Sequence, residues 1–127
     1  MNAATLDELL VYRKARELDR AITALVRHSD VRKDRMLAEQ MNAASLSVVS
    51  NIAEGFEQTT DRSFARYLVI SRASASELRS HISICGDRHE LSDDVVATPS
   101  ALCSEVIRML TPLIAYLTRS NRIRRRT

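Results

Sequence analysis

The sequence has few of the residues that build turn-rich, disulfide-bonded or aromatic proteins. Its 127 residues include two glycines, two prolines, two cysteines, five aromatic residues and no tryptophan. So little glycine and proline argues against disorder, collagen and a turn-rich β-sandwich, and two cysteines do not make a disulfide scaffold. The chain is instead 45% hydrophobic and 28% charged, and it is long enough for one domain with its own core. The composition therefore predicts a single all-α domain.

Signals for export and membrane insertion are also missing. Residues 1–5 lead directly into polar, charged sequence without the apolar core of a signal peptide. No stretch approaches the roughly 18 uncharged apolar residues that a membrane span requires. We therefore expect a soluble cytoplasmic protein without membrane contact.

Positive charge is concentrated at the C-terminal end. The chain has 19 basic and 16 acidic residues, which gives a net charge of +3. Residues 119–127 hold five arginines and no acid, whereas residues 1–118 are close to neutral. We expect residues 1–118 to form the folded domain and residues 119–127 to form a basic, arginine-rich tail. Arginine far outnumbers lysine, a bias that suits forked contacts with phosphate but that a GC-rich genome would also produce.

Apolar residues recur at three- and four-residue steps in four segments, which is the spacing of amphipathic helices. We expect helices over residues 5–28, 34–56, 61–88 and 98–118. Because short connections make successive helices run antiparallel, the sequence predicts an antiparallel up-down-up-down four-helix bundle. The expected core positions are Val11, Ala15, Leu18, Ile22 and Leu25 in the first helix, Leu37, Met41, Ala44, Val48 and Ile52 in the second, Phe64, Tyr67, Leu68, Ser71, Ala75, Leu78, Ile82 and Cys85 in the third, and Leu102, Val106, Met109, Leu113 and Leu117 in the fourth.

Several local signals mark helix ends. Thr5, with an acid three residues later, predicts a capping box, and Thr59, Thr60 and Asp61 are candidate N-caps of the third helix. Thr98 and Pro99 predict the cap and first residue of the last helix. Pro112 predicts a kink or a loosened turn in that helix.

The sequence lacks the motifs of common catalytic and cofactor sites. It has no Gly-x-Ser-x-Gly, no glycine-rich phosphate loop and no Glu-x-x-His of the kind that binds two metal ions in bundles. Glu54 and Glu77 lie near apolar stripes, where they are either catalytic carboxylates or partners in helix–helix contacts, and we expect the second. We expect no enzyme activity, no cofactor and no metal.

His81, Cys85 and His89 are the nearest approach to a metal-binding pattern, because four-residue steps bring side chains onto one helical face. Such steps rotate around the helix, and no close acid completes a tetrahedral set, so we expect Cys85 to be a core thiol rather than a zinc ligand. Cys103 lies in the next helix, where a disulfide is not expected in a reducing cytoplasm. We interpret both cysteines as packing residues.

Arginines form stripes on the first and third predicted helices, away from the apolar residues. On a helical wheel the four of the first helix lie within about 60° of one another, and those of the third, which include Arg62, spread more widely. They either face solvent, paired with acids such as Glu17, or contact a phosphate backbone. With so few aromatic residues, nucleic-acid binding would be electrostatic and weakly sequence-specific. The expected contact residues are Arg13, Arg16, Arg20, Arg27, Arg66, Arg72, Arg79, Arg122, Arg124, Arg125 and Arg126.

Three stretches occur in an order and spacing that resemble one protein family. Upstream lie residues 10–18, and downstream lie residues 64–72 with Ser74, Glu77 and Leu78. The most specific stretch consists of Asn51, Ile52, Ala53, Glu54, Gly55 and Phe56. Together they resemble the bacterial four-helix bundle proteins encoded by intervening sequences in 23S ribosomal RNA genes. The chain departs from that pattern at Asn42 and Ala43, where a basic pair is usual, and at Val49, where proline is usual, so we expect a straighter second helix.

The resemblance implies a four-helix bundle that assembles into a ring of five subunits. It also implies a relationship to the accessory variability determinant proteins of diversity-generating retroelements, which bind nucleic acid and a reverse transcriptase. The expected partners are therefore further copies of the chain, RNA or DNA, and a reverse transcriptase or another protein. The family has no established activity.

Two functions fit these observations, besides a less favoured metal-dependent or hydrolytic enzyme. The first is a non-catalytic oligomeric bundle that associates with nucleic acid through its arginines. The alternative is a protein-binding scaffold in which the arginines only keep the protein in solution. We also expect that deleting residues 122–127 leaves the fold intact, because they follow Leu117, and weakens nucleic-acid binding; a disordered tail without function is the competing interpretation.

Overall fold

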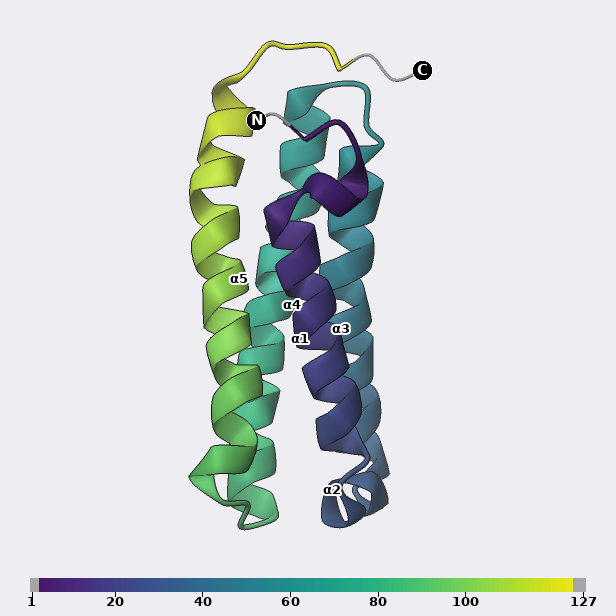
Figure 1. The fold of residues 1–127 in the computed structure, drawn as a ribbon, viewed down its shortest axis with the longest axis vertical. Helices are drawn as coiled ribbons and strands as arrows, with labels where there is room; N and C mark the ends of the chain where they lie inside the picture. Colours follow the sequence, from purple (N-terminus) through teal and green to yellow (C-terminus); the bar gives the residue numbers. More distant parts are fainter. Residues whose placement is uncertain (1–2, 125–127) are drawn as a thin grey trace.

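The computed structural model describes residues 3–124, and these residues are mostly helical (Figure 1). The all-α class predicted from the composition is confirmed for this part of the chain, which forms no β-sheet. A 3-10 turn precedes five helices. In chain order the elements are η1 (Leu6–Glu8), α1 (Leu10–Val26), α2 (Ser29–Lys33), α3 (Arg35–Phe56), α4 (Asp61–Arg88) and α5 (Asp93–Arg119).

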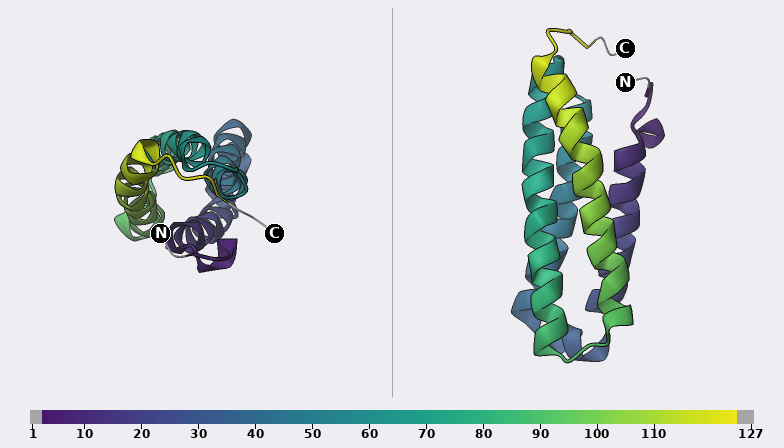
Figure 2. Two further views of the ribbon diagram at one scale, coloured as in Figure 1. Left: turned by 90° about the horizontal axis from the view of Figure 1, so that it is seen from above. Right: turned by 90° about the vertical axis from the view of Figure 1, so that its left-hand side faces the viewer.

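Four long helices lie side by side around one core (Figures 1 and 2). Helix α3 packs against α4, α4 packs against α5, and α1 contacts both α3 and α5. The chain descends α1, ascends α3, descends α4 and ascends α5 in the view of Figure 1. The short helix α2 lies at the connection between α1 and α3, so the long helices meet through brief connections.

The core follows the predicted apolar stripes in most of the molecule. Every expected core position of α1 and α3 is buried, and in α4 only Tyr67 is half-buried instead. In α5 the register differs, because Leu110 and Ile114 are buried whereas Met109 and Leu113 are half-buried. Helix α5 carries two adjacent rows of apolar residues, and its contacts with α4 and α1 select the row that faces the core.

Two predicted helix starts are wrong. Thr5 makes no capping hydrogen bond, and α1 begins only at Leu10, after η1. Helix α5 begins at Asp93 rather than at Thr98, and it continues through Pro99 and Pro112. Acidic residues in its first turn favour an earlier start through the helix dipole. The predicted Thr60 cap is confirmed, because its hydroxyl accepts a hydrogen bond from Ser63 N at 3.1 Å.

Helices α3 and α4 approach closely near their shared turn. A Cβ atom at Gly55 would lie 2.8 Å from Phe64 Cδ1 and 2.9 Å from Tyr67 Cβ. Further along, Ser71 Oγ donates to the Val48 carbonyl oxygen at 2.8 Å. Small side chains therefore allow this pair of helices to pack tightly.

The C-terminal segment, residues 120–124, folds back over the end of the molecule instead of extending as a free tail (Figures 1 and 2). Asp61 N donates to the Arg122 carbonyl oxygen at 3.1 Å, and Ser120 Oγ donates to Asp61 Oδ2 at 2.8 Å. Thr60 and Ile123 form an isolated antiparallel bridge. The premise that deletion from residue 122 removes no folded contacts is therefore wrong.

One described helix, α5, is long and apolar enough by length and composition to cross a membrane. It includes Glu105 and Arg108, so it is not an uncharged run. Its buried residues, among them Val106 and Leu110, form part of the common core. Core helices pass the same test of length and composition, so this result alone does not indicate a membrane span.

Candidate nucleic-acid interface

Three arginines of α4 donate hydrogen bonds to α5 at regular intervals. Their acceptors on α5 are seven residues apart. The acceptor residue numbers decrease as the arginine residue numbers increase, as expected where two helices run in opposite directions. Seven residues correspond to roughly 10 Å of helix, so the guanidinium groups are spread along the seam. The pairs are Arg62 Nε with the Thr118 carbonyl oxygen (3.4 Å), Arg72 Nη1 with Thr111 Oγ1 (3.4 Å) and Arg79 Nη1 with Ser104 Oγ (3.2 Å).

Together with three further arginines, this ladder makes one cationic surface, which we call the α4–α5 arginine face. All its members are exposed except Arg72, which is half-buried. None has a carboxylate partner within the described residues. The central parts of α4 and α5 contain one acid each, Glu77 and Glu105, and both are paired with other bases. The face consists of Arg62, Arg66, Arg72, Arg79, Arg108 and Arg119.

The arginine stripe of α1 lies elsewhere. Arg13, Arg16 and Arg20 are exposed and line a shallow depression of about 310 Å³ with Asp7 and Tyr12. Arg16 Nη1 donates to Tyr12 Oη at 3.1 Å, and this hydrogen bond raises the pKa of the Arg16 guanidinium. One arginine of this stripe is thus held in place by a side chain of its own helix.

The two predicted stripes do not converge within one chain. Helix α1 packs against α3 and α5, and α4 lies across the core from it (Figure 2). Arg27, the C-cap of α1, is exposed at the far end of that helix. Nucleic acid that contacts the α4–α5 arginine face would therefore meet the α1 stripe only through another copy of the chain.

The tail arginines have different environments, and for Arg124 the prediction is wrong. Arg124 is 6% exposed, and its guanidinium lies over the rings of Phe56 and Phe64, at 5.1 and 4.7 Å from their centroids. It forms an ion pair with Asp61 at 3.5 Å and donates to the Phe56 carbonyl oxygen at 3.0 Å. The charge of Arg124 therefore pairs with a carboxylate inside the fold and does not face a ligand in solution. Arg122 is exposed.

Two further predicted contacts, Arg125 and Arg126, lie outside the described residues.

The residues that carry the family resemblance are mainly packing residues. Asn51 Nδ2 donates to the Ser47 carbonyl oxygen at 2.9 Å, and Ser47 Oγ lies 2.7 Å from Ser74 Oγ on α4. Ile52 is fully buried, and Gly55 allows the close approach of α4. These residues form the α3–α4 interface.

The remaining three residues of the motif contribute less to packing. Ala53 is half-buried, and Glu54 is exposed. Glu77 is exposed and pairs with His81 at 3.5 Å. The carboxylates of Glu54 and Glu77 are therefore exposed, whereas the pKa of a catalytic acid is usually shifted by enclosure in a site.

His81, Cys85 and His89 do not converge on a common point. Cys85 is buried in the core, and burial raises the pKa of its thiol; burial raises the pKa of Cys103 to about 12. His89 Nε2 lies 2.9 Å from Asp34 Oδ2, at the start of α3. Residues 3–124 contain no group of three or more side chains placed to hold a metal ion.

Two members of the arginine face, Arg108 and Arg119, are not among the expected contact residues. Arg108 lies on the side of α5 that carries the hydroxyl acceptors, because it is four residues after Ser104 and three before Thr111. Arg119 directly follows Thr118 at the end of the helix. The hydroxyls at Ser104, Thr111 and Thr118 recur every seven residues. This seven-residue repeat of hydroxyl residues beside an apolar stripe was the sequence pattern that could have predicted the side of α5 facing the arginines of α4.

Comparison with known proteins agrees with this architecture. A protein of unknown function from the S23 ribosomal protein family of Bacteroides thetaiotaomicron has a similar structure, with a TM-score of 0.74 and 17% identity, over 82% of this chain and 97% of that one. At this identity the likeness shows the fold alone. No curated protein matches the sequence. The family model for the 23S rRNA-intervening sequence protein matches residues 7–112. The chain therefore belongs to the 23S rRNA-intervening sequence protein family.

Proposed function

We propose that the chain is a non-catalytic, oligomeric protein, built as an antiparallel up-down-up-down four-helix bundle, that associates with RNA or DNA in the cytoplasm. The α4–α5 arginine face contacts the phosphate backbone. The observation that carries this proposal is the charge of that face, where six arginines have no carboxylate partner in the described chain. Phosphate is the ligand that such a surface favours.

The hydrogen bonds of the ladder orient the guanidinium groups without neutralising them. Arg72 and Arg79 each donate one bond to a hydroxyl oxygen, and a guanidinium has five N–H donors. The other donors are available for forked contacts with phosphate oxygens. Contacts with phosphates carry no base information, so the bound RNA or DNA is selected by charge and shape rather than by sequence.

The test compares two variants that lose the same charge. One replaces Arg62, Arg72 and Arg79 by Gln, and the matched control replaces Arg13, Arg16 and Arg20 by Gln on α1. Binding is measured by fluorescence anisotropy at several salt concentrations, with a 23S rRNA fragment, an unrelated RNA and duplex DNA. We expect the α4 variant to lower the salt slope of log affinity by up to about 0.9 per lost contact on duplex DNA, or about 0.7 on single strands. The control should change the slope little.

Two results would contradict this proposal. If the wild-type protein does not bind at low salt, the arginine face is only a solvated surface. If both variants lose the same affinity, overall charge rather than this face is responsible. Arg62, Arg72 and Arg79 also donate hydrogen bonds to α5, so their replacement could lower stability as well as binding. A further variant with Arg66→Gln, Arg108→Gln and Arg119→Gln loses no such hydrogen bond between the helices. It therefore separates the effect on binding from the effect on stability.

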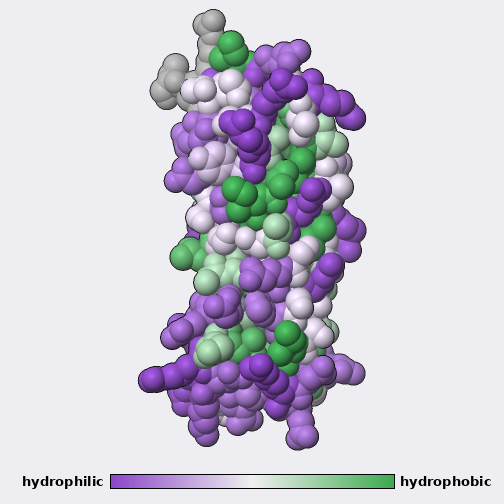
Figure 3. Space-filling view, turned by 180° about the vertical axis from the view of Figure 1, so that it is seen from behind, coloured by the Kyte–Doolittle hydropathy of each residue, from purple (hydrophilic) through white to green (hydrophobic). Residues whose placement is uncertain are grey.

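A protein scaffold is a second candidate function, and exposed apolar residues favour it. Leu46 on α3 and Val69 and Ile70 on α4 are 64%, 44% and 50% exposed. Seen from behind, the surface of the molecule shows apolar patches among its polar residues (Figure 3). Such surface commonly marks contact with another protein chain.

A further inference from the structure

The packing of α1 against α5 is incomplete at one end. Helix α1 has 17 residues and α5 has 27. The first residue of α1, Leu10, borders the same cavity as Met109. Residues 110–119 of α5 therefore extend about 15 Å beyond the start of α1. Of the described residues N-terminal to α1, those of η1 and the segment from residue 3 lie near this part of the seam (Figure 1).

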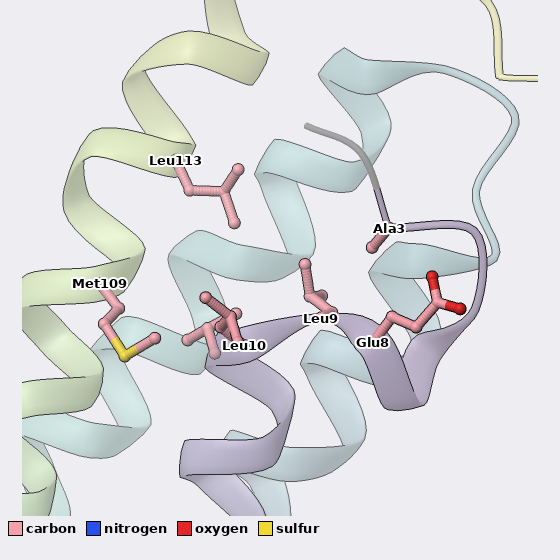
Figure 4. Close-up of a pocket in the computed structure, with 7 residues that line it drawn as sticks. Ala3, Glu8, Leu9, Leu10, Met109 and Leu113 are labelled. Atoms are coloured by element: carbon pink, nitrogen blue, oxygen red, sulfur yellow. The ribbon is translucent and has the colours of Figure 1, made fainter.

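An apolar cavity of about 450 Å³ occupies this position. Ala3, Glu8, Leu9 and Leu10 line it from the N-terminal part of the chain, and Met109 and Leu113 line it from α5 (Figure 4). Leu10 is 65% exposed. Its side chain therefore leaves apolar surface in contact with water at the start of α1. The half-burial of Met109 and Leu113, which departs from the predicted core, has its cause here.

The cavity continues into a second, cationic depression. This depression has a volume of about 470 Å³, shares Leu10 and Met109 with the cavity, and extends to Arg13 and Arg20. We call the two together the α1–α5 groove. Lys14 lines it as well, but its ammonium is paired with carboxylates of Glu17 and Glu105 at 3.0 and 3.5 Å.

The second depression has a small excess of positive charge, because the bases Arg13, Lys14 and Arg20 line it together with the acids Glu17 and Glu105. Arg13 and Arg20 have no carboxylate partner within residues 3–124. Glu8 adds a negative charge to the lining of the apolar cavity. An occupant therefore needs apolar side chains at the Leu10 end and carboxylates at the Arg20 end, where the charge of the groove is complementary to them.

We propose that the α1–α5 groove binds an amphipathic, acidic helix of a partner protein. Its apolar side chains pack between Leu9, Leu10, Met109 and Leu113, and its carboxylates pair with Arg13 and Arg20. A helix fits because the neighbouring elements are themselves helices, and a helix in a groove is a common mode of recognition.

The spacing of the groove residues defines the partner further. Arg13 and Arg20 lie three and ten residues after Leu10, or about 4.5 and 15 Å along the helix axis. The carboxylates of the partner helix therefore lie one to three turns from its apolar anchors. A second copy of this chain has no separate helix of this kind among the described residues, because its long helices, including α3 and α4 with their exposed apolar residues, pack against one another in its own bundle.

The probe is a fluorescein-labelled designed peptide of about 18 residues, long enough to form a helix. It carries leucines at positions i and i+4 and glutamates one to three turns further along. One control peptide has the same composition in scrambled order, and another has lysine in place of glutamate. The full chain is titrated into each peptide, and anisotropy gives the affinity.

We expect the glutamate peptide to bind more tightly than either control. Leu10→Gln should weaken its binding about tenfold or more, because a buried leucine side chain contributes about that factor. Met36→Gln is the matched control, since Met36 is an exposed apolar residue (76%) at the start of α3. It should leave the affinity unchanged. Gln at both Arg13 and Arg20 should remove the preference for glutamate over lysine.

Several outcomes would overturn the proposal. These are no binding of the glutamate peptide, equal affinity for the scrambled peptide, or equal effects of Leu10→Gln and Met36→Gln. If Leu10→Gln instead lowers the mass of the protein in light scattering, the groove holds a second copy. If RNA binding weakens in Leu10→Gln as much as peptide binding does, the groove is part of a nucleic-acid surface. Failure of the peptide leaves the proposed role of the α4–α5 arginine face untouched, because the variants differ.

Discussion

Single residues explain why the end of the molecule near the α3–α4 turn is closed. Arg124 occupies an apolar site between Phe56 and Phe64, whose rings are 6.0 Å apart and nearly perpendicular. A charge in such a site is tolerated only with a partner, and the carboxylate of Asp61, itself 1% exposed, provides it. The sequence shows a run of arginines in which this one has no distinguishing feature.

Arg124→Met should destabilise the protein by about 3 kcal/mol, because it leaves the buried Asp61 carboxylate without its cation. Urea unfolding of the full-length protein measures the change. Arg122→Gln, at an exposed position, should have almost no effect and is the control. Adding Asp61→Asn to Arg124→Met should cost less than the sum of the single changes, since the two residues act as a pair. Additive effects would contradict the assigned pairing.

Gly55→Ala should lower the free energy of unfolding by about 1–3 kcal/mol, because the new methyl group meets α4 in a region that is already filled. Helix propensity alone predicts the opposite, a gain of about 1 kcal/mol. Gly86→Ala tests this difference, since its Cβ would meet only the side chain of Val96, at 3.3 Å. A Gly55→Ala protein as stable as the wild type, or Gly86→Ala more damaging than Gly55→Ala, would argue against the close helix approach.

At the scale of elements, contacts between helices decided several helix ends. Asp34 precedes α3 but makes no capping bond; its carboxylate instead accepts hydrogen bonds from His89 and Arg88 at the end of α4. The acids of its first turn allow α5 to begin before Thr98, with Pro99 buried inside the helix. Local capping signals compete with such contacts and with the helix dipole, and here they did not prevail.

Stability should depend on pH through Asp34. The hydrogen bond from His89, and then that from Arg88, lowers the pKa of this carboxyl in the folded protein. A lowered folded pKa contributes stability above the unfolded value of about 3.9, and that stability is lost as the pH falls through the folded value. Asp34→Asn should therefore be less stable than wild type at neutral pH. The difference should shrink below about pH 4, where the carboxyl of the unfolded chain becomes protonated, and should be lost once the pH falls below the lowered pKa of the folded protein.

Urea unfolding at a series of pH values measures this dependence. Asp30→Asn, at an exposed acid in α2, is the control and should show no such trend. A constant difference between wild type and Asp34→Asn across this pH range would show that the carboxylate charge is not what holds the two helix ends together.

At the scale of the whole molecule, the arginine face and the exposed apolar residues meet on α4. Val69 lines one shallow depression with Arg62 and Arg66, and Ile70 follows Arg66 by one helical turn. The α1–α5 groove lies on a different pair of helices. Contact between copies through α4 would therefore border the proposed nucleic-acid surface, whereas the groove is separate from both.

The oligomer is tested by light scattering, in which the protein should have a mass several times the 14.3 kDa of one chain. Ile70→Glu combined with Leu46→Glu should lower that mass, because charges replace apolar contacts between copies. Met36→Glu, at an exposed apolar position at the start of α3, should leave the mass unchanged. A single-chain mass for the wild-type protein at micromolar concentration would remove the oligomer and the possibility that stripes from different copies meet.

The candidate site could be predicted only in part. Arg66, Arg72 and Arg79 were identified because they avoid the apolar stripe of their own helix. Arg108 was missed, since its membership depends on which side of α5 faces α4. Arg124 was misassigned because residues near the end of a chain give no periodic pattern to interpret.

Local patterns in the sequence were enough to predict the all-α class, the extent of α3 and α4 within a residue, and the buried stripes of α1 and α3. They could do so because long periodic segments record which side of a helix is apolar. The tertiary structure alone decided the register of α5, the return of residues 120–124 over the α3–α4 turn, and the neighbours of each arginine. These features depend on contacts between residues far apart in the chain, and for Arg124 that means Asp61, 63 residues away. No local pattern encodes such a distance.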